Sequence, residues 1–121
     1  MRLPGIKVKQ EAYLSSANGK FLDLIDMVIM EYIWIRWEQR WNIATIVEDN
    51  KSYINVSTNS ILNAYPCFGI KTKNGIRRHI KKIIDLGYLE LNTSCKELSM
   101  SLYNVTEEFI SIKTYEHNMN H

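Results

Sequence analysis

The residues best suited to chemistry form a cationic run between positions 71 and 82. The run holds six bases and no acid: Lys71, Lys73, Arg77, Arg78, Lys81 and Lys82. The whole chain has 15 bases and 13 acids, so the rest of the chain carries a net charge of −4. A positive field concentrated on one segment of an acidic body is typical of a surface that binds phosphates.

A helix is expected to present this run on one face. The pattern predicts a helix over 73–86, with Thr72 as its N-cap and Gly87 as its C-terminal stop. At 100° per residue, one side of that helix is apolar and the opposite side is polar or cationic. The apolar side holds Ile76, Ile80 and Ile83, and the other side holds Asn74, Arg78, Lys81 and Lys82, with Arg77 on the flank.

These residue types match the groups that read DNA. Arginine pairs with guanine and asparagine with adenine, so Asn74 and Arg78 are expected to face base edges. Lys81 and Lys82 are expected to bind phosphates, which position a protein without specifying sequence. The alternative is a solvated basic face on an ordinary amphipathic helix.

The surrounding pattern predicts a single α+β domain over 1–121. Residues 1–19 are weakly patterned and are interpreted as an N-terminal arm, 20–112 as the core and 113–121 as a tail. The expected elements are a long helix over 20–41, a short strand over 53–56, a helix over 58–64 capped by Ser57, the helix over 73–86, a hairpin of 88–91 with 98–103, and a helix over 107–114 capped by Thr106. Ile43 to Val47 could continue a helix or start a strand, and Asn50-Lys51 is expected to form a turn.

Several stretches resemble winged helix-turn-helix proteins of phages and plasmids. They are YPCFGIKTK at 65–73, RRHIKKI at 77–83, LGYL at 86–89 and YNVTE at 103–107. Over about residues 20–112 the chain is most similar to the N-terminal DNA-binding modules of replication initiators. The resemblance implies a three-helix core with a β-hairpin wing, in which Lys73, Asn74, Arg77 and Arg78 contact double-stranded DNA. It also implies replication initiation or transcriptional regulation of a mobile element. The connection over 65–71 is longer than the turn of the simplest helix-turn-helix.

The tip of the expected hairpin carries one base, Lys96, with Glu97 beside it. A wing contact to DNA through Lys96 stays open, because Glu97 partly cancels its field.

Two further features of the long helix have alternative interpretations. Asp23 and Asp26 lie near its positive end and are interpreted as capping charges. Its aromatic side chains, which are Tyr32, Trp34, Trp37 and Trp41, fit either core packing or a homodimer surface.

Other functions have less support in the sequence. An interaction module that docks on an acidic protein is the main alternative to DNA binding. A small enzyme is not expected, because the sequence shows no catalytic constellation. No cofactor is expected either, because no nucleotide-binding loop occurs. No metal is expected either, because the spacings of His79, His117, His121, Cys67 and Cys95 match no zinc pattern. The sequence shows no signal peptide and no apolar stretch of membrane-spanning length, which predicts a cytoplasmic protein with free thiols and no membrane partner.

Overall fold

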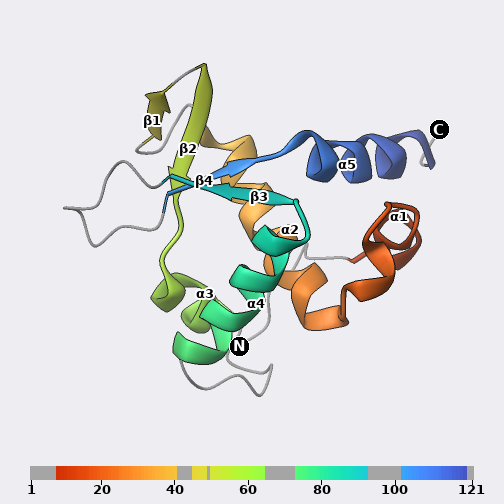
Figure 1. Ribbon diagram of the computed structural model, residues 1–121, viewed down its shortest axis with the longest axis horizontal. Helices are drawn as coiled ribbons and strands as arrows, with labels where there is room; N and C mark the ends of the chain where they lie inside the picture. The colour runs from red at the N-terminus through yellow and green to blue at the C-terminus, as the bar shows by residue number, and fades with distance from the viewer. Residues whose placement is uncertain (1–7, 41–44, 49, 65–72, 93–101, 120–121) are drawn as a thin grey trace.

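The chain folds as an α+β structure in which helices pack around a small antiparallel sheet (Figure 1). A computed structural model describes residues 8–40, 45–48, 50–64, 73–92 and 102–119. The elements within these ranges are α1 (Gln10–Leu14), the 3-10 turn η1 (Gly19–Phe21), α2 (Leu24–Glu38), β1 (Thr45–Glu48), β2 (Lys51–Asn55), α3 (Thr58–Ala64), α4 (Lys73–Asp85), β3 (Leu89–Leu91), β4 (Leu102–Val105) and α5 (Glu107–Met119).

Helix α2 is the central helix of the core. It begins at Leu24 because Asp23 forms a capping box with Asp26: each carboxylate accepts the other residue's backbone N–H, at 2.8 and 3.0 Å. The predicted start at residue 20 was therefore early, and Gly19–Phe21 form the separate turn η1. Residues from 26 to 33 are buried or half-buried on every side of α2, so the helix is enclosed by its neighbours.

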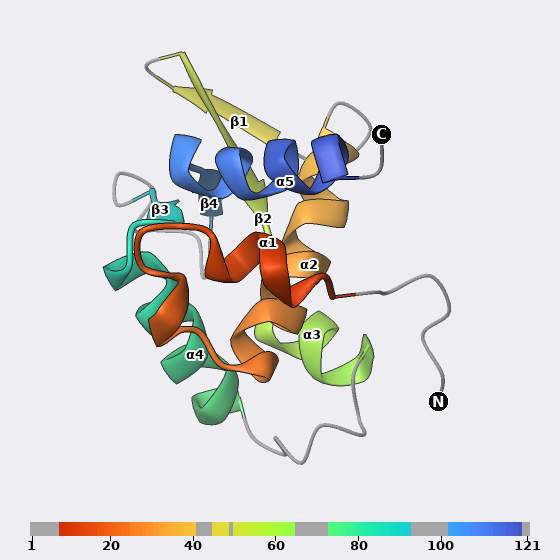
Figure 2. The same ribbon diagram turned by 90° about the vertical axis from the view of Figure 1, so that its right-hand side faces the viewer.

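Part of the segment interpreted as an N-terminal arm is a helix instead. Helix α1 buries Ala12 and Tyr13 completely. Figure 2 shows α1 crossing in front of α2 and below α5, and it contacts both helices. Five residues are too few to show a helical period, which explains why the sequence pattern missed this element.

The sheet joins β2, which precedes α3 and α4, to the β3–β4 hairpin, which follows them. Its strand order is β1-β2-β4-β3, and all three pairings are antiparallel. Strand β2 confirms the strand predicted near 53–56, while β1, in the region left open, precedes it across a turn where Asn50 has a φ of 63°. The hairpin is confirmed, but its second strand is described only from Leu102, since 93–101 lie outside the described residues.

Three predicted cap positions are confirmed by hydrogen bonds. The Ser57 hydroxyl accepts the Ser60 N–H at the start of α3. Gly87, at a φ of 91°, ends α4, and the N–H groups of Gly87 and Tyr88 bond carbonyls of the last turn. Thr106 caps α5 and also donates its hydroxyl to the Gly87 carbonyl at 2.6 Å. The end of α4 is thereby tied to the start of α5.

Helix α5 runs past the predicted end at residue 114, into the segment interpreted as a tail. Its Lys113 is only 10% exposed and bonds the buried carboxylate of Glu31 on α2. Tyr13 donates to the same Glu31 oxygen at 2.5 Å. One carboxylate therefore holds α1 and α5 against α2. Among the described helices, none is long and apolar enough to cross a membrane.

Candidate nucleic-acid interface

Helix α4 has the dry face that its sequence predicts. Ile76, Ile80 and Ile83 are at most 3% exposed, and the helix packs against α2 and α3. Burying three isoleucines contributes about 1.5–3 kcal/mol each and fixes which side of α4 points outward. The polar positions 74, 77, 78 and 81 are all exposed.

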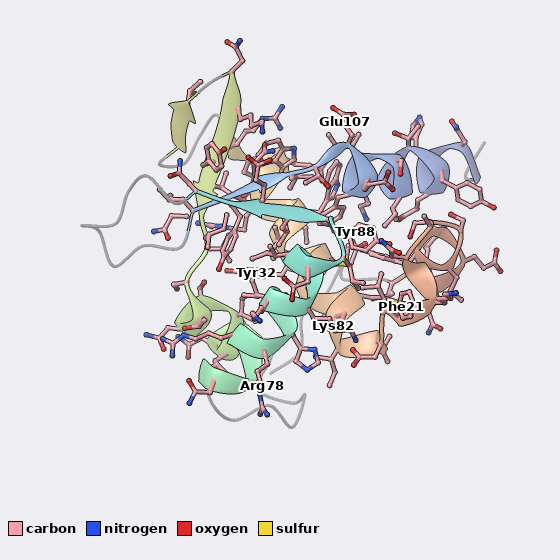
Figure 3. All side chains as sticks on the ribbon, viewed as in Figure 1. Phe21, Tyr32, Arg78, Lys82, Tyr88 and Glu107 are labelled. Atoms are coloured by element: carbon pink, nitrogen blue, oxygen red, sulfur yellow. The ribbon has the colours of Figure 1, made fainter. Side chains whose placement is uncertain are left out.

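The exposed face carries three bases and one amide. The Arg77 guanidinium donates to the Asn74 side-chain oxygen at 3.1 Å, so these two side chains form a unit at the N-terminal half of α4. Arg78 projects away from the body of the protein in Figure 3. Lys81 is 80% exposed and lies 4.0 Å from Asp85, a contact that solvent screens strongly. Most of this positive charge is available to an external anion.

Lys82 differs from these residues. The sequence assigned it to a phosphate, but its ammonium nitrogen lies 2.5 Å from Asp26 and 3.8 Å from Asp23. Figure 3 shows its side chain directed toward the start of α2. Asp26 is completely buried, so this is a contact between a half-exposed cation and an interior carboxylate.

His79 completes the group around Asp26. Its Nδ1 lies 2.5 Å from the second Asp26 oxygen and 3.9 Å from Asp23. Capping by Asp23 and Asp26 is confirmed, and both carboxylates also have basic partners on α4, which the sequence pattern did not indicate. His79 is 53 residues from Asp26 in sequence, so no local pattern could reveal the contact.

The ionic contact favours the charged forms of both partners. Burial acts to raise the pKa of Asp26, but hydrogen bonds from Lys82, the Asp23 backbone and His79 outweigh it and hold the pKa below its ordinary value. The hydrogen bond to Asp26 raises the pKa of Lys82 in turn. Asp23, Asp26 and His79 hold ligand atoms within 4.8 Å of one another, a spacing a metal ion could use. In this arrangement the Lys82 ammonium is the cation at Asp26.

Several predicted contacts fall outside the described residues. Lys71, the cap Thr72, the connection over 65–71 and Lys96 of the hairpin tip are among them. Cys67, Cys95 and His121, for which no metal site was expected, also lie outside the described residues. Lys73 begins α4, but its side chain is not described. The structure therefore brings together Asn74, Arg77, Arg78 and Lys81, and it separates Lys82 from them by its bond to Asp26.

The aromatic residues of α2 support core packing. Trp37 is 8% exposed, Tyr32 and Trp34 pack against the core, and the Trp34 ring lies 5.5 Å from that of Phe109. Arg40 covers the Trp37 ring at 4.5 Å. For the described aromatic side chains these contacts favour core packing over a homodimer surface. Trp41 lies outside the described residues.

A cleft of about 530 Å³ lies between the β1–β2 hairpin, the end of α2 and the start of α5. Its charged side chains are Arg40, Lys51, Glu90 and Glu107, and Lys51 and Glu90 form an ion pair at 2.9 Å. Among the bases of α4 whose side chains the structure describes, none lines this cleft.

Comparison of the chain with protein-family models, curated proteins and solved structures finds no match.

Proposed function

We propose that this protein binds double-stranded DNA through the exposed face of α4, as a winged helix-turn-helix domain. The single observation that carries the proposal is the orientation of α4. Ile76, Ile80 and Ile83 are buried. On the opposite side of the helix, Asn74, Arg77, Arg78 and Lys81 are exposed. A helix that shows cations outward and sits firmly on a core is the form in which proteins present side chains to the major groove.

The connectivity supports the proposal. A central helix (α2), a strand (β2), two helices (α3 and α4) and a hairpin (β3–β4) follow in the winged-helix order. Strand β2 pairs with the second hairpin strand β4, and α4 contacts the first hairpin strand β3. This layout is compatible with a winged helix, and the strand β1 and helix α1 are additions to it.

The residues have separate roles in this proposal. Asn74, Arg77 and Arg78 face the bases, and Lys81 binds a phosphate. Lys71, Lys73 and Lys96 are expected to add contacts from the start of α4 and from the hairpin tip. The biological role is replication initiation or transcriptional regulation of a mobile element, in the cytoplasm, without a cofactor.

The test is the affinity for duplex DNA measured across a salt series. Each lost phosphate contact lowers the slope of log affinity against log salt by about 0.9. We expect Lys81→Ala to lower the slope by that amount, and Arg78→Ala to weaken binding as well. Lys20→Ala removes an equal charge from η1 and is the matched control. Unchanged affinity and slope in both α4 variants would refute the assignment.

The alternative is a module that docks on an acidic protein through the same face. Titration with duplex DNA and duplex RNA beside a pull-down separates the two. A stable protein partner combined with no salt-dependent affinity for either nucleic acid would favour the alternative.

A further inference from the structure

Two side chains of α4 converge on one buried carboxylate at the start of α2. His79 and Lys82 are three residues apart and lie on the same side of α4. Each reaches a different oxygen of Asp26 at 2.5 Å. Asp26 is itself fixed, because its carboxylate also accepts the Asp23 backbone N–H in the capping box of α2.

This pair of contacts bears directly on the DNA-facing residues. Arg78 precedes His79, and Lys81 precedes Lys82, so each exposed base stands 100° around the helix from an anchored neighbour. Anchors at two positions three residues apart oppose rotation of α4 about its axis. Rotation of α4 would carry Arg78 and Lys81 together away from the outward direction.

We infer that Lys82 is a positioning residue, which with Asp26 refines the orientation that the buried isoleucines give to α4, and which does not itself bind DNA phosphate. The inference rests on the proposed function. For Lys82 to bind a phosphate it would have to leave Asp26, whose carboxylate is 0% exposed. Removing the cation from an interior carboxylate strongly destabilises the folded protein. We therefore expect the bond between Lys82 and Asp26 to persist when DNA is present.

The experiment compares two charge-matched double variants of the full chain. Asp26→Asn with Lys82→Met removes the interior pair and leaves no unpaired buried charge. Asp85→Asn with Lys81→Met removes the exposed pair one residue earlier on the same helix, whose partners are 4.0 Å apart. Both variants keep the net charge of the wild type. Urea unfolding of each confirms that it is folded before its affinity for duplex DNA is measured across the salt series.

We expect the two variants to differ in the kind of loss. The Lys81 variant should show a slope lowered by about 0.9. The Lys82 variant should bind several-fold more weakly at every salt concentration, with the slope of the wild type. The single variant Lys82→Arg retains a cation for Asp26 and should keep most of the wild-type affinity for duplex DNA.

Three results would overturn one of the two proposals. A slope lowered by about 0.9 in the Lys82 variant would make Lys82 a phosphate contact. Unchanged affinity and slope in that variant would make the pair a structural feature without a positioning role. Wild-type protein with no salt-dependent affinity for duplex DNA would instead refute the proposed function, and with it the inference.

Discussion

Replacing Tyr13 by phenylalanine tests how α1 is held in the core. The Tyr13 hydroxyl is completely buried and donates to Glu31 at 2.5 Å, and burial together with the Glu31 charge raises the pKa of Tyr13 far above its ordinary value. A hydrogen bond to a charged acceptor contributes about 1.5–3 kcal/mol. Because Lys113 still neutralises Glu31 in the variant, the larger penalty for an unpaired buried charge does not apply. We expect Tyr13→Phe to cost about 2 kcal/mol.

Urea unfolding followed by circular dichroism measures this loss. The slope of the unfolding free energy against urea concentration should be unchanged, because the compactness of the unfolded state is unaltered. For a chain of this length the melting temperature should fall by about 8 °C. Tyr53→Phe is the matched control. Its hydroxyl bonds Glu90 at 3.1 Å, but that carboxylate is 41% exposed and also bonds Lys51, so the loss should stay below about 1 kcal/mol. Equal losses in the two variants would refute the reasoning that the buried contact holds α1.

Two more predictions concern stability. Gly19→Ala would place a Cβ 2.0 Å from the Tyr13 carbonyl oxygen, which is backbone and cannot move aside, and should cost about 3 kcal/mol in urea unfolding. Gly87→Ala meets no atom within 4 Å and should cost only about 1–2 kcal/mol, from its φ of 91°; a larger loss at Gly87 than at Gly19 would contradict this account. In acid, the lowered pKa of Asp26 means that its contribution to stability is present above its ordinary pKa of 3.8 and is lost as the pH falls through the lower, folded value. Asp26→Asn should therefore flatten the fall of the unfolding free energy below about pH 4, and an acid profile identical to that of the wild type would contradict the assignment.

The sequence predicted best those features that short-range chemistry decides. The apolar spacing of α4 located its buried face, because Ile76, Ile80 and Ile83 recur at the helical period. Ser57 and Thr106 could be assigned as caps because a hydroxyl there bonds a backbone N–H three residues later. The order of elements followed from the same signals. None of these features depends on a partner that is distant in sequence.

Features that depend on distant partners were missed. Helix α1 is short, and its burial rests on Tyr13, whose partner Glu31 is 18 residues away. Strand β1 is a different case: its partner β2 is close in sequence, and the segment was left open because its own residues resemble a helix end as much as a strand. The aromatic side chains of α2 fitted both core packing and a dimer surface, and only their contacts with neighbouring elements favour core packing.

The basic run shows most clearly why charge counted along a sequence overstates the charge a surface offers. Lys81 and Lys82 are adjacent and identical, yet their side chains are 80% and 37% exposed, because a step of 100° turns one toward solvent and the other toward α2. The bond to Asp26 cancels the charge of Lys82 locally. Arg77, Arg78 and Lys81 remain as the described bases of the proposed DNA-binding face, and Lys81, the one assigned to a phosphate, should add about 0.9 to the salt slope. If Lys82 also bound a phosphate, the two lysines would add about 1.8, a difference that a salt titration resolves.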